Sequence, residues 1–159
     1  GTAGNGLYAG AMNTAMIVAT QMADNQSGSF AAKVCAYYSV TVGRVTYGDW
    51  YLPSKYELNL LYLQKVAVGG FASAYYWSST EYGSNGGAWL QYFDGGFQYY
   101  SYKDNTYRVR AVRDFKQTIF SENLSASAKA LIVFSFLKNI RLYQLICATF
   151  IIRHTTTQN

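Results

Sequence analysis

The side chains that could carry out chemistry are few and widely separated. The only histidine is His154, and the two cysteines, Cys35 and Cys147, form no Cys-x-x-Cys motif. A hydrolase needs a Ser/His/acid set or convergent carboxylates, and a zinc site needs closely spaced Cys or His residues. We therefore expect no catalytic residue, no metal site, no cofactor and no enzymatic activity. The apolar surroundings of Cys35 predict a buried thiol, and a disulfide with Cys147 stays open.

The acidic side chains favour structural explanations. Glu57 lies three residues after Ser54, which is the spacing of a capping box at the start of a helix. For Glu81 we expect an ion pair with Arg108 or Arg110, and a contact with a ligand is the alternative. The carboxylates therefore give no sign of acid–base catalysis.

A segment rich in aromatic and small polar residues gives the strongest indication of function. Of the 23 residues from Tyr82 to Asp104, 17 are Tyr, Phe, Gly, Ser, Asn or Asp. Antibody loops have a similar composition, because rigid aromatic rings give large contact areas and small polar residues adapt to the ligand. We predict a ligand-binding surface on one exposed face, made by Tyr82, Ser84, Asn85, Leu90, Tyr92, Asp94, Phe97, Tyr99, Tyr100, Ser101, Tyr102 and Asp104.

The alternative is that these rings stack across the strands of a sheet and serve stability. Tyr99, Tyr100 and Tyr102 argue against this as a full explanation, because successive side chains of a strand point to opposite faces. If one face is buried, some of these rings must face solvent. A large exposed aromatic cluster usually marks a binding site.

The charge distribution argues against nucleic acid as a partner. The net charge is +5, but the 13 Lys and Arg residues are spread along the chain and form no dense basic stripe. Proteins that bind nucleic acid concentrate positive charge on one face. Charged residues are only 13% of the chain whereas 16 residues are Tyr, so many phenol groups are expected at the surface.

Three segments carry helical signals. Ala11–Met22 contains good helix formers and has an apolar stripe through Met12, Ala15, Met16 and Val18 or Ala19. Phe30–Tyr38 is predicted as a second helix. The third begins after Ser54, continues with Leu58, Leu61, Tyr62 and Lys65 on one face, and ends at Gly69-Gly70.

Extended segments surround and follow these helices. Trp50–Leu52 is predicted as a short strand that Pro53 ends, and Tyr75–Ser79 as another. Ala88–Phe93 and Phe97–Tyr102 flank Asp94-Gly95-Gly96, which predicts a hairpin. Tyr107–Ala111 alternates polar and apolar residues like a half-buried strand. The order of elements predicts an α+β domain over residues 1–115.

Residues 116–159 have a different composition. Two apolar runs, Ala130–Leu137 and Leu142–Ile152, are shorter than the roughly 20 residues that a membrane span needs. We expect a helical or poorly ordered tail of uncertain role, and contact with a membrane is a less favoured alternative. The chain starts at Gly1 rather than Met, which leaves open a preceding segment such as a signal peptide.

Several motifs in order resemble the Lcl C-terminal domain and the related Fibrobacter major paralogous domains over residues 1–115. They are Asp49-Trp50-Tyr51-Leu52-Pro53-Ser54, Glu57-Leu58, Tyr76-Trp77-Ser78-Ser79-Thr80-Glu81, Ala88-Trp89, Asp94-Gly95, Lys103 and Val109-Arg110-Ala111-Val112-Arg113. The resemblance implies a C-type-lectin-like fold, also described as formylglycine-generating-enzyme-like, with two to three helices around a small twisted antiparallel sheet. The calcium-binding motifs of sugar-binding C-type lectins and the paired cysteines of formylglycine-generating enzymes do not occur in this segment.

The aromatic segment is also similar to the diversified segment of variable proteins from diversity-generating retroelements. That similarity implies an extracellular location, on a bacterial surface or a phage particle, and a protein or glycan ligand on a cell surface. Trp77, Ser78, Ser79, Trp89 and the Arg-Val-Arg segment would be the invariant framework. Variable proteins usually end soon after the last strand, whereas this chain continues for 44 residues beyond Phe115. A glycan-binding adhesin and a structural module of an envelope protein are the alternatives.

Overall fold

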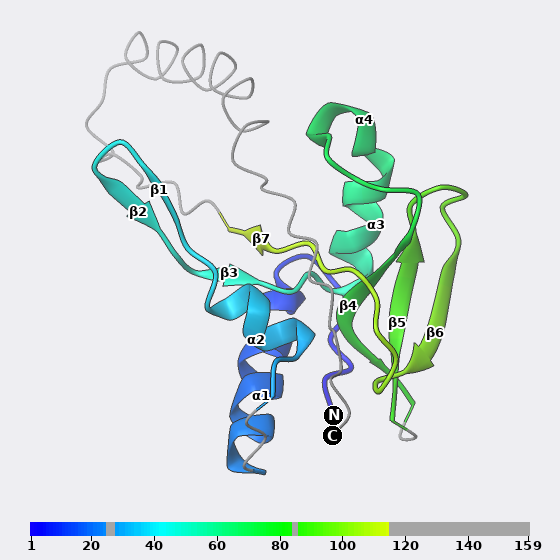
Figure 1. Ribbon diagram of the computed structural model, residues 1–159. Helices are drawn as coiled ribbons and strands as arrows, with labels where there is room; N and C mark the ends of the chain where they lie inside the picture. Colours follow the sequence, from blue (N-terminus) through cyan, green and yellow to red (C-terminus); the bar gives the residue numbers. More distant parts are fainter. Residues whose placement is uncertain (25–27, 84–85, 115–159) are drawn as a thin grey trace, which may run out of the picture.

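The computed structural model describes residues 1–24, 28–83 and 86–114, which form an α+β domain. Its centre is a three-stranded sheet with helices on both sides (Figure 1). The predictions for residues 116–159, including Cys147 and His154, lie outside the described residues. None of the helices in the described part of the chain is long and apolar enough to span a membrane.

The strands form three separate antiparallel sheets. The central sheet has the order β4-β5-β6, a short hairpin pairs β1 with β2, and β3 pairs with β7. The bounds are Val40–Val42 for β1, Val45–Tyr47 for β2, Trp50–Tyr51 for β3, Tyr75–Tyr82 for β4, Gly87–Tyr92 for β5, Gln98–Tyr102 for β6 and Val112–Arg113 for β7. The predicted hairpin around Asp94-Gly95 is confirmed as the β5–β6 pair.

Helices α1 and α2 cover one face of the central sheet, and α3 covers the other (Figure 1). Their bounds are Ala9–Ala23 for α1, Ala31–Ala36 for α2, Lys55–Leu63 for α3 and Lys65–Val68 for the single-turn α4. Trp77 and Leu90 pack with Ala32 and Cys35 of α2, whereas Tyr76 packs with Leu58 of α3. Neighbouring residues of β4 therefore supply the two sides of the core, as strand alternation requires.

The predicted apolar stripe of α1 does not face the core, apart from Val18, which packs against it. Met12 is 70% exposed and Met16 is 46% exposed, whereas Gly10, Asn13 and Thr14 are buried. Polar groups of this buried face find partners on distant segments. Asn13 Nδ2 donates to Ser79 Oγ at 3.3 Å, and Thr14 Oγ1 accepts from the Leu52 N–H at 3.0 Å. Apolar periodicity cannot detect a helix face that is held by hydrogen bonds.

The start of α3 confirms the predicted capping box. Ser54 Oγ accepts from the Glu57 N–H at 3.2 Å, and Glu57 Oε2 accepts from the Ser54 N–H at 2.8 Å. The same carboxylate is buried and also accepts from the Tyr8 N–H, the Gly10 N–H and the Tyr51 hydroxyl. Glu57 therefore joins the N-terminal segment, β3 and α3. We call Glu57 and its four donor residues the Glu57 hub.

The predicted strand Tyr107–Ala111 is corrected to an extended segment with one parallel bridge, between Arg108 and Tyr76. Val109 is 8% exposed and Arg110 is 1% exposed, so the burial does not alternate. The Arg110 guanidinium lies 4.4 Å from the centre of the Phe71 ring and donates to the Gly69 carbonyl at 3.1 Å. A buried arginine therefore stands where the alternating pattern predicted a solvent-facing residue.

Candidate ligand-binding surface

Four aromatic side chains of β6 and its preceding turn face solvent. Phe97 is 60% exposed, Tyr99 51%, Tyr100 55% and Tyr102 65%. They are exposed on both faces because the helices pack mainly on β4 and β5, and β6 is the outer strand of the sheet. Figure 1 shows β6 at the outer border of the sheet, farthest from α1 and α2.

One group of these rings lies on the sheet face that α3 covers. Tyr82 and Tyr100 stack with ring centres 3.8 Å apart, and the edge of the Tyr82 ring meets the Trp89 ring at 5.1 Å. The ammonium group of Lys55 lies 3.1 Å from the centre of the Trp89 ring, where partial burial lowers the pKa of Lys55. Tyr102 follows Tyr100 by two residues and so belongs to the same face.

The other group lies on the opposite face of the sheet. Tyr75 and Tyr92 stack at 4.6 Å, and Tyr99 meets the Tyr75 ring at 6.3 Å with its plane nearly perpendicular. Tyr107 packs against Tyr75 at 5.8 Å. This cluster continues directly into the core, since Tyr107 also meets the buried Trp77 at 5.2 Å.

The prediction of a single exposed face is therefore wrong. Tyr82, Tyr100 and Tyr102 point to one side of the sheet, and Tyr92 and Tyr99 point to the other, because the strand alternates. Leu90 is also corrected, since it is 3% exposed and packs in the core with Trp77.

The remaining predicted residues have mixed positions. Asp94 and Asp104 are exposed, and Tyr92 and Ser101 are half-buried. Ser101 Oγ accepts from Asn105 Nδ2 at 2.9 Å, which orders the turn after β6. Ser84 and Asn85 lie outside the described residues.

Glu81 forms a different ion pair from the one predicted. Its carboxylate accepts from Lys103 Nζ and from the Thr2 N–H, not from Arg108 or Arg110. Partial burial alone would raise the pKa of Glu81, but the Lys103 ammonium and the Thr2 N–H together hold it below its ordinary value. The ion pair connects the N-terminal segment to the end of β6.

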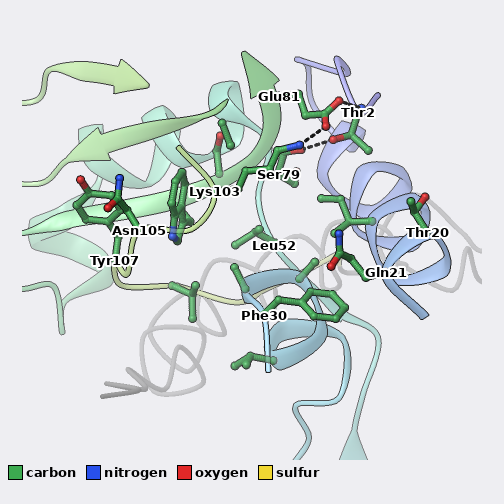
Figure 2. A pocket seen from close by; sticks show the side chains of 18 of the residues that line it. Thr2, Thr20, Gln21, Phe30, Leu52, Ser79, Glu81, Lys103, Asn105 and Tyr107 are labelled. Carbon is green, nitrogen blue, oxygen red and sulfur yellow. Dashed lines mark hydrogen bonds and ion pairs between the residues drawn. The ribbon is translucent and has the colours of Figure 1, made fainter. Parts of the chain in front are cut away.

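A groove of about 650 Å³ lies between α1, α2 and the sheet face that carries Tyr99 (Figure 2). Its apolar lining includes Ile17, Phe30, Leu52, Trp77 and Val109, and Glu81, Lys103, Asp104 and Asn105 also border it. No local sequence pattern predicts this groove, because its walls come from segments that are distant along the chain.

Two hydroxyl groups that line the groove already donate hydrogen bonds within the protein. Thr2 Oγ1 donates to the Ser79 carbonyl at 3.0 Å, and Ser78 Oγ donates to the Trp89 carbonyl at 2.8 Å. The lining beside these two groups is mainly apolar and so suits apolar groups of a ligand.

The groups available for chemistry are limited in the residues that the structure describes. They include no cluster of three His, Cys, Asp or Glu side chains that could hold a metal ion. Burial raises the pKa of the Cys35 thiol to about 12, so this thiol is neutral and enclosed in the core. Cys35 is thus confirmed as a buried core residue. What the surface can offer a ligand is aromatic area and phenol hydroxyls.

Comparison with known proteins supports the motifs quoted above. The family model of the Lcl C-terminal domain matches residues 11–113, which is more than half of the chain. No curated protein and no solved structure gives a significant match.

Proposed function

Because this chain belongs to the Lcl C-terminal domain family, we propose that it is a non-enzymatic ligand-binding protein. The ligand contacts the exposed rings of Tyr82, Phe97, Tyr99, Tyr100 and Tyr102. The observation that carries this proposal is that all five rings are at least 40% exposed, four of them on β6 or in the turn before it, and that Tyr82 of β4 stacks on Tyr100. Clusters of exposed aromatic rings of this kind often mark a binding site.

The α+β architecture is compatible with a C-type-lectin-like fold, which forms part of the proposal. In that fold, the sheet edge formed by β6 would serve as the platform for recognition. A ligand would bury ring area and would satisfy the phenol hydroxyls at its rim.

The exposed rings form two surfaces, one on each face of the sheet. A ligand can therefore contact one surface or both. A ligand that touches only one face of the sheet meets either Tyr82, Tyr100 and Tyr102 or Phe97 and Tyr99. A ligand that wraps around β6 meets both. We favour the face with Tyr82 and Tyr100, because these two rings stack on each other and are held against Trp89. A preordered surface loses less side-chain entropy on binding.

A protein ligand is favoured over a glycan. Sugar rings bind by stacking on the open face of an aromatic ring, so a glycan-binding adhesin would use the Tyr rings and Trp89 in this way. The Lys55 ammonium covers one face of the Trp89 ring, and the Tyr82 and Trp89 rings form a T-shaped pair. The remaining exposed rings are Phe97 and several tyrosines, and tyrosines are typical of surfaces that bind proteins.

The proposal includes diversification, as in variable proteins of diversity-generating retroelements, and a location on a bacterial surface or a phage particle. The burial pattern supports it. Trp77, Ser78, Ser79 and Arg110 of the expected invariant framework are each at most 7% exposed, whereas the β6 tyrosines are at least half exposed. Substitutions at the exposed positions would change recognition with little effect on the core.

Protein and glycan arrays, probed in parallel with the purified chain, test this function. We expect binding to a protein target that is lost when Tyr100→Ala and Tyr102→Ala are combined. Tyr37→Ala is the matched control, because Tyr37 is 64% exposed but belongs to the end of α2. Binding that survives the double substitution, or that Tyr37→Ala weakens equally, would contradict the proposed surface.

A further inference from the structure

The outer edge of β6 carries backbone groups whose direction follows from the hairpin. The Tyr92 N–H donates to the Phe97 carbonyl at 2.8 Å, and the Lys103 N–H donates to the Gly86 carbonyl at 2.9 Å. In an antiparallel pair, hydrogen-bonded residues alternate with residues whose N–H and C=O groups point away. The backbone groups of Gln98, Tyr100 and Tyr102 therefore point away from β5.

These outward groups have few partners within the described part of the chain. The Tyr102 carbonyl accepts from the Asn105 N–H at 3.1 Å, and no described backbone group bonds to Gln98 or Tyr100 on this side. Natural sheets protect such edges with charges, prolines or bulges. β6 has the sequence Gln-Tyr-Tyr-Ser-Tyr and lacks all three devices.

We propose that β6 pairs with β6 of a second copy of this chain, forming one continuous six-stranded sheet. A row of alternating N–H and C=O groups fits only another extended polypeptide. Antiparallel pairing about a two-fold axis at Tyr100 places Tyr100 opposite Tyr100 of the second copy. It also places each Gln98 opposite Tyr102, so every outward N–H meets a carbonyl, and the Tyr102 carbonyl accepts a second hydrogen bond besides the one from the Asn105 N–H.

The charges do not oppose this arrangement at its axis. No charged residue lies between Gln98 and Tyr102, so no like charges meet there. Antiparallel pairing about Tyr100 places Lys103 opposite Phe97 and Asp104 opposite Gly96 of the other copy, so one charge of each sign lies toward its Asp94 turn. Parallel pairing would instead bring like ends together.

The available area sets the expected strength. An aromatic side chain carries on the order of 200 Å² of surface, so the exposed parts of Phe97, Tyr99, Tyr100 and Tyr102 amount to roughly 450 Å² per copy. A standard stable interface buries about 800 Å² per partner. Even if all of it were buried, this area is about half of a standard interface, so we expect a weak dimer that forms as the concentration rises.

The inference does not rest on the proposed function, since it requires no ligand. If both hold, the Tyr82–Tyr100 surfaces of the two copies become neighbours and make one wider binding face. Failure of the array experiment would leave the dimer untouched, and a monomeric protein could still bind its ligand.

Sedimentation velocity of the full chain, from low to high micromolar concentration, tests the dimer with two substitutions at one position. Tyr100→Pro removes the outward N–H and the ring but no hydrogen bond to β5, whereas Tyr100→Val removes the ring alone. Because the axis relates the two Tyr100 residues, Tyr100→Pro removes two intermolecular hydrogen bonds and should raise the dissociation constant about tenfold or more beyond Tyr100→Val. Tyr37→Val should leave it unchanged.

Amide hydrogen exchange of the unmodified chain gives a second test that does not depend on the folding of a variant. Exchange at Gln98, Tyr100 and Tyr102 should slow as the concentration rises. Tyr99 and Ser101 should be protected at every concentration, because they already bond to β5. A chain that stays monomeric, an association that Tyr100→Pro leaves unchanged, or protection confined to another surface would overturn the proposal.

Discussion

The Glu57 hub and the β6 edge are two different ways of using polar groups in the same small domain. In the hub, one buried carboxylate accepts four hydrogen bonds of 2.8–3.1 Å from Tyr8, Gly10, Tyr51 and Ser54. At the edge, phenol rings contact one another and their hydroxyls reach solvent. Each donor of the hub depends on one acceptor in one position. A ring of β6 can be replaced by another side chain without leaving a buried polar group unpaired.

This difference separates the residues that hold the fold from those that are free to recognise a ligand. The hub connects the N-terminal segment, β3 and α3, and so fixes the frame on which β4 and β5 lie. Burial raises the pKa of the Tyr51 phenol and the nearby Glu57 carboxylate raises it further, so Tyr51 keeps the proton that it donates to Glu57. The edge strand β6 is held in place by its pairing with β5, and its exposed side chains add little to the stability of the frame.

Removing the hub carboxylate should have the largest effect. Glu57→Ala leaves two backbone N–H groups, the Tyr51 hydroxyl and the N-cap N–H of α3 without their acceptor. We expect a loss of roughly 3–5 kcal/mol in the free energy of unfolding, because an unpaired buried donor costs about 1–3 kcal/mol and water can restore part of that. Urea denaturation measures it. Asp94→Ala is the control, since it removes an exposed carboxylate, and equal losses would refute the role of the hub.

Adding one methyl group to the hub should have the next largest effect. A Cβ on Gly10 would meet the Glu57 carboxylate and would lie 2.8 Å from both the Leu52 carbonyl and the Ser54 nitrogen. We expect Gly10→Ala to cost about 1–3 kcal/mol, which is typical of overpacking in a tight core. Gly28→Ala is the control, because nothing lies within 4 Å of its added Cβ. Thermal melts compare the two, and a Gly10→Ala variant as stable as the control would refute close packing.

The hub and the edge also differ in how far the sequence could predict them. Local patterns succeed where the determinant is local. The spacing of Ser54 and Glu57 predicts the capping box, and Asp94-Gly95 predicts the β5–β6 hairpin. The three further donors to Glu57 come partly from residues almost fifty positions away, which no local pattern contains. The family resemblance followed from motifs in order along the chain and is confirmed.

The single-face prediction failed for a physical reason, and part of that reason could be predicted from the sequence. Adjacent Tyr99 and Tyr100 must point to opposite faces of any strand. What the sequence could not supply is the strand order β4-β5-β6, which makes β6 an edge and exposes both faces. The ion pair between Glu81 and Lys103 was missed for the same reason, since it depends on how β6 ends beside the N-terminal segment.

At the edge, truncation of a large ring should have little effect on stability. Tyr102 is 65% exposed, so Tyr102→Ala should change the free energy of unfolding by about 0.5 kcal/mol or less. Tyr76→Ala is the matched contrast, because Tyr76 is 0% exposed and packs against Phe93. That change should cost about 3–5 kcal/mol. Chemical denaturation of both variants sharpens the comparison, and similar losses would show that β6 belongs to the framework.

The smallest effect should come from the ion pair that joins the two regions. The Lys103 ammonium and the Thr2 N–H hold the pKa of Glu81 below its ordinary value of 4.5, although partial burial acts in the opposite direction. A carboxylate whose pKa is lower in the folded state stabilises the fold above its ordinary pKa, and this contribution is lost as the pH falls through the lowered value. We therefore expect a small loss of stability below about pH 4.5 that is absent in Glu81→Gln.

Because Lys103 is exposed, added salt should reduce this difference between the two proteins. Denaturation at several pH values, with and without salt, measures it. A Glu81→Gln variant with an unchanged pH dependence would mean that the Glu81 carboxylate does not contribute to stability.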